Sequence, residues 1–304
     1  MLPLLLFLVP NAPEAAPPTS AAPIVVGFSQ DTLANDWRQT QARELEQAFA
    51  TLPGYRLLVT DGMGHTAKQI SDIEDLLRLP VDILIASPRD AHTMTPVIAK
   101  AHRSGIPVIL LTRSIESSDY TTLIAADDAS IARAAAHHIA SELKGHGDIL
   151  MLQGVPSAST AEIRTAAFER ALKEFPHMHV SARKVGNYLR ADALRAVEEV
   201  LAAKIPFDAI YAQSDSMASG ARLALKKAGI DPARKLIVGI DYIGEAREAI
   251  RAGEQNASFL YPTCSREAVA AVKALAQGKS LPKRIVVDSL KITRANVEHV
   301  APIF

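Results

Sequence analysis

Polar and charged side chains follow the apolar segments of this chain at the positions where those segments end. A carboxylate accepts hydrogen bonds from two hydroxyl groups at once, and a guanidinium group presents a planar fork of N–H donors. An aromatic face beside such groups covers the C–H side of a sugar ring. The segment-end positions supply all three kinds of group: Ser29 to Arg38 with Trp37, Ser87 to Asp90, Thr112 and Arg113, Gly154 to Arg164, Asn187 to Arg190, Ser214 and Asp215, and Asp241. This set predicts a binding site for a small polyhydroxylated solute.

Short segments rich in β-branched and aliphatic residues predict the strands that carry these side chains. Most are continuous apolar runs, which are typical of strands covered on both faces in a parallel sheet. The predicted strands are 24–28, 55–59, 81–86, 107–111, 122–125, 148–152, 180–185, 208–212, 235–240, 257–260 and 284–290. In open sheets of this kind ligands bind beyond the carboxyl ends of the strands, so the polar residues that follow them are the candidates for a site.

Amphipathic segments lie between the predicted strands. Apolar residues recur at helical spacing in 37–49, 70–77 and 161–175, and each segment has one apolar face. A strand, a helix and a strand repeated about every 30 residues indicate a doubly wound α/β sheet with right-handed crossovers. The repeats are too many for one sheet, so we expect an α/β chain with two Rossmann-like lobes that change over near residues 125–130.

Composition excludes several classes of protein. The 304 residues carry 33 Lys and Arg against 33 Asp and Glu, with 48% apolar residues and one cysteine. Zero net charge argues against a nucleic-acid-binding protein, and the apolar content argues against a disordered chain. Cys264 alone supplies neither a disulfide nor a zinc cluster, and His137 and His138 point about 100° apart on a predicted helix. We expect no metal and no cofactor.

Sequence motifs for catalysis are missing. The segment GVPSASTAEIR at 154–164 lacks the G-x-S-x-G elbow of a serine hydrolase. No P-loop and no G-x-G-x-x-G segment offers a cradle for a nucleotide phosphate. We therefore expect a binding protein and not an enzyme. An enzyme built on this fold is the alternative, and a turnover assay would expose it.

The first residues have the composition of an export signal. Residues 1–9 are almost all apolar, and residues 10–23 are rich in Ala and Pro, although no Lys or Arg precedes the apolar stretch. The stretch is shorter than the ~20 residues of a membrane-spanning helix. We expect residues 1–23 to be a leader and the protein to be exported to the periplasm.

Six segments together resemble the ribose and galactofuranose group of type I periplasmic binding proteins. They are VVGFSQ…NDWRQT (25–40), AKQISDIEDLLRLPVDILIASPRD (67–90), GIPVILLTRSIE (105–116), LQGVPSASTAEIRTAAFERAL (152–172), IYAQSDSMASGARLALKKAG (210–229) and IVGID (237–241). The resemblance implies two lobes joined by a hinge of three crossovers, which close on a ligand. The first lobe would comprise residues 24–126 and 258–287, and the second would comprise residues 127–257 and 288–304.

The resemblance also implies which residues form the site. Carried over by position, the ligand-binding residues would be Ser29, Asn35, Trp37, Arg38, Ser87, Arg113, Arg164, Tyr188, Ser214 and Asp241. The chain departs from the ribose pattern at Arg38, Thr112, Ser214 and Leu260, which argues against ribose itself. Trp37 with Arg38 and the phrase LLTRSIE (110–116) are closer to galactofuranose-binding proteins. Three arginines against one carboxylate would admit a furanose, a sugar acid or another small anion.

Some of these residues also have structural alternatives. Trp37 could be a core anchor whose N–H is satisfied nearby. Arg113 and Arg164 could form surface or interlobe ion pairs, and Asp241 could cap the following helix.

Two interpretations of the function stay open. In the first, the protein delivers a monosaccharide to an ABC permease. In the second, a sensor histidine kinase reads the same closure, and the phrase SFLYPT (258–263) resembles the extracytoplasmic sugar-sensing domains of such kinases. Both predict a monomer that binds no nucleic acid. The effector domain of a LacI-type repressor shares the fold but would need a helix-turn-helix ahead of the first strand.

Overall fold

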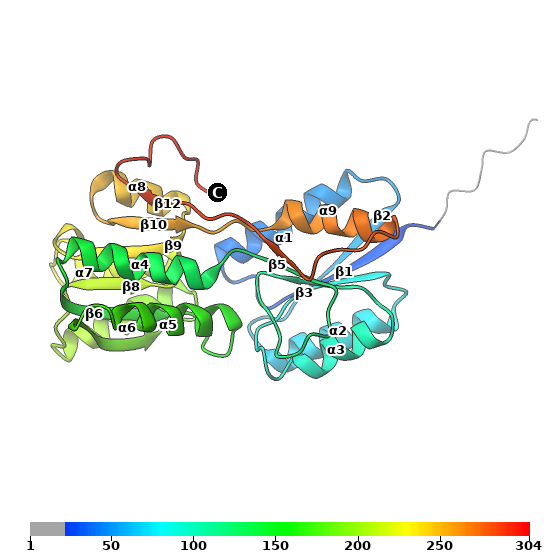
Figure 1. The fold of residues 1–304 in the computed structure, drawn as a ribbon, viewed down its shortest axis with the longest axis horizontal. Helices are drawn as coiled ribbons and strands as arrows, with labels where there is room; N and C mark the ends of the chain where they lie inside the picture. The colour runs from blue at the N-terminus through cyan, green and yellow to red at the C-terminus, as the bar shows by residue number, and fades with distance from the viewer. Residues whose placement is uncertain (1–21) are drawn as a thin grey trace, which may run out of the picture.

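Two six-stranded sheets, each covered by helices on both faces, form two lobes in the computed structural model, which describes residues 22–304 (Figure 1). The sheet of the first lobe has the order β11-β5-β4-β3-β1-β2, and all its strands are parallel. Its elements are β1 Ile24–Gln30, α1 Asp36–Ala50, β2 Tyr55–Asp61, α2 Thr66–Arg78, β3 Ile83–Ser87, α3 Thr95–Arg103, β4 Val108–Leu111, β5 Thr122–Ala125, α9 Ser265–Ala276 and β11 Arg284–Val286. Helices α1 and α9 cover one face, and α2 and α3 cover the other.

The second lobe repeats this plan with one antiparallel edge strand. Its sheet has the order β12-β10-β9-β8-β6-β7, in which β12 pairs antiparallel with β10. Its elements are α4 Asp128–Glu142, β6 His146–Gln153, α5 Ser159–Leu172, β7 His177–Val185, α6 Arg190–Ala202, β8 Ala209–Ala212, α7 Asp215–Lys227, a short 3-10 helix Pro232–Arg234, β9 Leu236–Asp241, α8 Gly244–Ala252, β10 Ala257–Leu260 and β12 Lys291–Thr293. The predicted α/β fold with two lobes is confirmed.

The chain passes between the lobes three times, at 126–127, 261–264 and 287–290. These segments form a narrow hinge in which Val287 N donates to Ala125 O (3.0 Å) and Leu260 N donates to Leu290 O (2.9 Å). The predicted return to the first lobe at residue 258 comes too early, because Ala257–Leu260 pair with β9 of the second sheet. The predicted strand 284–290 ends at Val286, and its last residues form the third crossover.

Local sequence explains where the helices next to the cleft begin. A side chain with an oxygen acceptor at the N-cap satisfies a free backbone N–H of the first turn. Asn35 accepts from Arg38 N at the start of α1, Asp127 accepts from Ser130 N before α4, and Ser214 accepts from Met217 N before α7. Each cap follows a strand end, so the first turns of these helices face the cleft.

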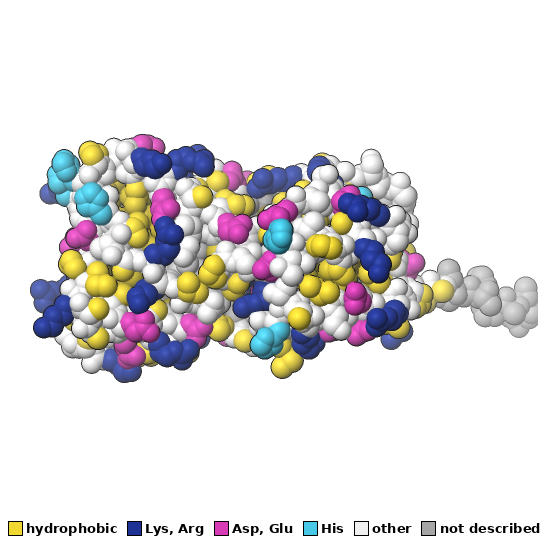
Figure 2. Space-filling model, turned by 90° about the horizontal axis from the view of Figure 1, so that it is seen from below, with side chains coloured by type: hydrophobic (Ala, Val, Ile, Leu, Met, Phe, Trp, Pro, Cys, Tyr) yellow, Lys and Arg dark blue, Asp and Glu magenta, His cyan; other side chains and the backbone are white. Residues whose placement is uncertain are grey.

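The surface carries no large field of one sign on the face drawn in Figure 2, where Lys and Arg alternate with Asp and Glu. No helix within residues 22–304 is both long and apolar enough to cross a bilayer. The predicted leader, residues 1–23, lies outside the described residues except for its last two.

Candidate functional site

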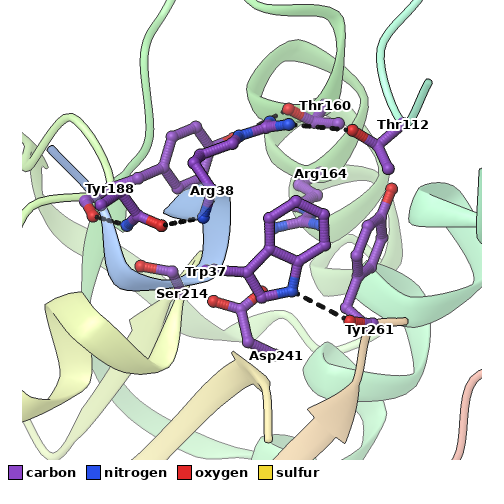
Figure 3. A pocket seen from close by; sticks show the side chains of 10 residues that line it. Trp37, Arg38, Thr112, Thr160, Arg164, Tyr188, Ser214, Asp241 and Tyr261 are labelled. Carbon is purple, nitrogen blue, oxygen red and sulfur yellow. Dashed lines mark hydrogen bonds between the residues drawn. The ribbon is translucent and has the colours of Figure 1, made fainter. Parts of the chain in front are cut away.

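A cavity lies between the lobes, at the carboxyl ends of both sheets (Figure 3). With the lobes in this arrangement, the space between its walls that is open to a water-sized sphere is about 30 Å³. The first lobe contributes four side chains, the second contributes five, and the second crossover contributes one: Asn35, Trp37, Arg38 and Thr112; Thr160, Arg164, Tyr188, Ser214 and Asp241; and Tyr261.

Most of the residues predicted for the site meet in this cavity. Those that line it are Asn35, Trp37, Arg38, Arg164, Tyr188, Ser214 and Asp241. The other three, Ser29, Ser87 and Arg113, are buried behind the wall of the first lobe. Ser87 Oγ accepts from Arg38 Nη1 at 2.7 Å, and the Arg113 guanidinium lies 5.6 Å from the centre of the Tyr188 ring. The structure therefore brings the ten residues together, but Ser29, Ser87 and Arg113 do not line the cavity.

Trp37 lines the cavity and is also part of a buried apolar cluster. Its Nε1–H donates to Tyr261 O at 3.1 Å, and the two rings are 5.9 Å apart. The residue is 4% exposed and shares its cluster with Ile131 of the second lobe. Trp37 is therefore a packed anchor that also lines the cavity.

Arg38 points from the first turn of α1 into the cavity wall. Its Nη1 donates to Ser87 Oγ and to Thr112 Oγ1 at 3.1 Å, and its guanidinium lies 4.9 Å from the centre of the Trp37 ring. Burial, together with the nearby charge of Arg113, lowers the pKa of Arg38 to about 10. The side chain is still cationic at neutral pH.

Asp31 is the counter-ion of the first-lobe arginines, and the sequence analysis did not single it out. Its Oδ2 lies 2.8 Å from Arg113 Nη1 and 3.8 Å from Arg89 Nη1, and its Oδ1 lies 3.5 Å from Arg38 Nε. Burial alone would raise the pKa of Asp31, but the charges of the three arginines outweigh it and lower that pKa. Asp31 stands directly after β1, so the strand-end rule contained it without giving it a role.

In the second lobe, Asp128 is the counter-ion of Arg164. Arg164 Nε donates to Asp128 Oδ1 at 2.7 Å, and Nη1 donates to Gln213 O at 2.6 Å. Burial works against the charge on Arg164, but attraction to Asp128 and to the nearby tyrosines outweighs burial and raises the pKa of Arg164. Arg113 and Arg164 therefore do form ion pairs, but the pairs are buried and each lies within one lobe, so they are neither surface nor interlobe pairs. Arg164 also lines the cavity.

Asp241 presents its carboxylate to the cavity from an unusual backbone conformation. Asp241 and Tyr242 have φ of 112° and 60°, in the region that residues other than glycine rarely adopt. Asp215 holds this turn, because its Oδ2 accepts from Tyr242 N at 2.6 Å. Burial raises the pKa of Asp241 well above its usual value, although Arg164 opposes this. The helix-cap alternative for Asp241 is wrong, because Ile243 stands at the N-cap of α8.

Tyr188 closes the second-lobe wall. Its ring packs on Gly154, where an added Cβ would lie 1.9 Å from Tyr188 Cζ. Tyr188 Oη is hydrogen-bonded to Thr160 Oγ1 at 3.0 Å, and its backbone oxygen accepts from Asn35 Nδ2 across the cleft at 2.5 Å. Thr160 lies within the strand-end segment 154–164 but was not among the residues carried over from the family resemblance; it stands in the first turn of α5.

Further contacts across the cleft show that the lobes are closed. Ala91 N donates to Ser157 O and Ser114 N donates to Ser159 Oγ, both at 2.9 Å. At the cleft mouth Arg190 Nη2 lies 3.0 Å from Asp36 Oδ2.

Comparison with known proteins agrees with this architecture. A family model described as a periplasmic binding protein domain matches residues 26–280. A galactofuranose-binding protein of Escherichia coli (strain K12) is 29% identical over 274 residues, which cover 87% of this chain and 86% of that protein. A ribose import binding protein of Bacillus subtilis (strain 168) is 28% identical over 295 residues, 94% of each chain. The solved fructose-binding periplasmic domain of a hybrid two-component system matches with a TM-score of 0.86 at 30% identity, over 90% of this chain and 92% of that one.

Proposed function

The chain belongs to the periplasmic binding protein family, and on this premise we propose that it is an exported receptor that binds a neutral monosaccharide, such as a furanose, between its lobes. The observation that carries the proposal is the convergence of Trp37, Arg38, Arg164 and Asp241 on one closed cavity. A ligand that touches both lobes stabilises the closed state through its differential affinity for that state.

The polar groups left free in the cavity match a sugar. Among residues 22–304, no side chain donates a hydrogen bond to the Asp241 carboxylate. Arg38 Nη2 and Arg164 Nη2 likewise have no hydrogen-bond acceptor among these residues. Sugar hydroxyls would donate to Asp241, and hydroxyl or ring oxygens would accept from the two guanidinium groups. The Trp37 ring would cover the apolar side of the sugar.

The charges around the cavity favour a neutral sugar over a sugar acid. The buried arginines Arg38, Arg113 and Arg164 are matched by three buried carboxylates, Asp31, Asp128 and Asp241. The excess of arginine over carboxylate inferred from the sequence disappears once Asp31 and Asp128 are included. A ligand that brought a further negative charge would upset this balance of buried charges.

The downstream partner follows from the family. We propose that the closed protein delivers its sugar to an ABC permease, as the import function named for the ribose-binding relative suggests. A second candidate is signalling to a sensor kinase, which the name of the fructose-binding domain of a two-component system favours. Capture of a permease or of a kinase by the sugar-loaded protein separates the two.

A thermal-shift panel followed by calorimetry tests the ligand class. We expect at least one of D-galactose, L-arabinose, D-ribose and D-fructose to raise the melting temperature, because ligand at 100 times its dissociation constant adds about 2.7 kcal/mol of stability. D-Galacturonate serves as the charged counterpart of D-galactose. A shift with the acid and not with the neutral sugars would refute the neutral assignment. A shift with phosphate esters or amino acids alone would refute the sugar assignment.

A further inference from the structure

Tyr261 occupies a position unlike that of the other cavity residues. It is the first residue of the second crossover, directly after β10, whereas the other nine belong to the lobes themselves. Its side chain is buried, at 2% exposure, and points into the cavity beside Arg164 and Trp37 (Figure 3). A residue in this place touches the ligand site and the hinge together.

The hydrogen bonds of Tyr261 connect the two lobes. Its backbone oxygen accepts from Trp37 Nε1 of the first lobe at 3.1 Å, and its Oη donates to Asp128 Oδ2 at 3.2 Å. Asp128 is the first residue of α4, directly after the first crossover. The Tyr261 side chain therefore joins the second crossover to the residue that directly follows the first crossover.

Tyr261 also helps to satisfy the carboxylate that holds Arg164. Asp128 is buried, and its two oxygens accept from Arg164 Nε and Tyr261 Oη. The Arg164 guanidinium in addition lies 4.6 Å from the centre of the Tyr261 ring. A buried carboxylate that loses one of its partners is destabilised, so removal of the Tyr261 hydroxyl weakens the support of Arg164.

Opening of the lobes turns them about the crossovers, so the contacts of Tyr261 with the two lobes change during the motion. Resting on the proposed function, we infer that Tyr261 is a positioning residue that couples the sugar cavity to the hinge. It holds Arg164 in place through Asp128, and it joins the first lobe only when the Trp37 N–H reaches its backbone oxygen.

A double-mutant cycle with Tyr261→Phe and Asp128→Asn tests this inference. The probe is whichever of D-galactose, L-arabinose, D-ribose and D-fructose gives the largest thermal shift with the wild type. We expect Tyr261→Phe to weaken binding about tenfold by calorimetry, and to weaken it by less than about threefold in the Asp128→Asn background. Small-angle scattering at saturating sugar should show a larger residual open fraction for Tyr261→Phe than for the wild type.

Tyr211→Phe is the matched control. Tyr211 is also buried in the second lobe, stacked on Phe168 at 4.0 Å, and its hydroxyl has no partner among the described residues. We expect this variant to bind and close like the wild type.

The outcomes separate the inference from the proposed function. Unchanged affinity in Tyr261→Phe overturns the inference, as does an equal loss in both backgrounds, which would mean that the hydroxyl acts on the sugar without Asp128. If Tyr261→Phe does not fold, Trp37→Phe carries the test, because it removes the other hydrogen bond of this residue, and unchanged binding would then refute the coupling. A wild type that binds none of the four sugars refutes the proposed function itself.

Discussion

Each arginine that the sequence placed in the site is held by a carboxylate from the same lobe. Arg113 pairs with Asp31, and Arg164 pairs with Asp128, in both cases among buried atoms. Such pairing fixes the direction of a long side chain before the ligand arrives, which lowers the entropy lost on binding. Asp241 differs from Asp31 and Asp128, because its carboxylate is left to accept hydrogen bonds from the hydroxyl groups of the proposed ligand.

Asp241→Asn should therefore stabilise the ligand-free protein and weaken its function. Burial keeps a proton on Asp241 over a pH range in which the unfolded chain has lost it, so the folded state binds more protons there. The free energy of unfolding then falls as pH rises from about 4 through the folded pKa. We expect the variant to lose this dependence, to be more stable than the wild type at pH 8, and to bind sugar at least about tenfold more weakly. Urea unfolding at pH 5 and pH 8, with calorimetry, measures both effects.

Asp127→Asn is the control for that experiment. The Asp127 carboxylate accepts from Ser130 N, which lowers its pKa, so its charge contributes stability above pH 4 and the variant should not become more stable at pH 8. An Asp241→Asn variant that is less stable than the wild type at pH 8 would contradict the argument.

For single residues, the sequence predicts which side chains reach the cleft better than it predicts which side chains pair with one another. Residues after strand ends could be found because the carboxyl ends of parallel strands face the cleft, and Trp37, Arg164 and Asp241 were found in this way. The ion pairs could not be found, because a pair such as Arg113 and Asp31 joins two strand ends whose side-chain directions depend on packing. Tyr261 was quoted only within a family phrase, since a crossover residue carries no periodic signal.

Among the elements, the loop after β7 depends on a contact with the loop after β6. Asn187 and Tyr188 both have positive φ, and the Tyr188 ring packs closely against Gly154. No side chain at position 154 is compatible with the ring in this place. The second-lobe wall of the cavity is therefore shaped by the pair Gly154 and Tyr188.

Gly154→Ala should displace the Tyr188 ring from the cavity wall. An overpacked contact of this kind costs about 1–3 kcal/mol of stability, and we expect sugar binding to weaken as well. The matched test is a double-mutant cycle with Tyr188→Ala, measured by urea unfolding and calorimetry. Without the ring, the added methyl group should cost little. An equal cost in both backgrounds would show that the damage arises elsewhere.

The predicted strands and helices agree with the structure wherever an apolar run is covered on both faces. In β3, for example, every residue is buried. The short edge strand β12 was not predicted, because Lys291–Thr293 has only Ile292 buried and looks like a loop. The apolar run 257–260 predicted a strand but did not indicate to which sheet it belongs, since both sheets have the same kind of interior.

For the whole molecule, closure brings exposed charges together at the cleft mouth. Arg190 Nη2 of the second lobe lies 3.0 Å from Asp36 Oδ2 of the first lobe and 2.8 Å from Glu245 Oε1 of its own lobe. All three side chains are partly exposed, so the pair across the cleft contributes at most about 1 kcal/mol.

Asp36→Asn should weaken sugar binding by at most about fivefold at low ionic strength, because it removes an attraction that exists only in the closed state. Salt screens exposed charges, so the difference from the wild type should vanish at 0.5 M NaCl. Asp72→Asn, which removes an ion pair with Lys68 inside α2, is the control and should leave affinity unchanged. A loss that persists at high salt would mean that the carboxylate acts in another way.

The chain crosses the hinge three times, and this affects how the protein folds during its synthesis. The last strands, β11 and β12, complete the edges of different sheets. A nascent chain that has left the ribosome only as far as residue 280 therefore has two unfinished lobes, and neither lobe can be produced as one uninterrupted gene fragment. Removal of the chain from β11 onward would disrupt both lobes, and neither sheet is complete until its own last strand has been synthesised.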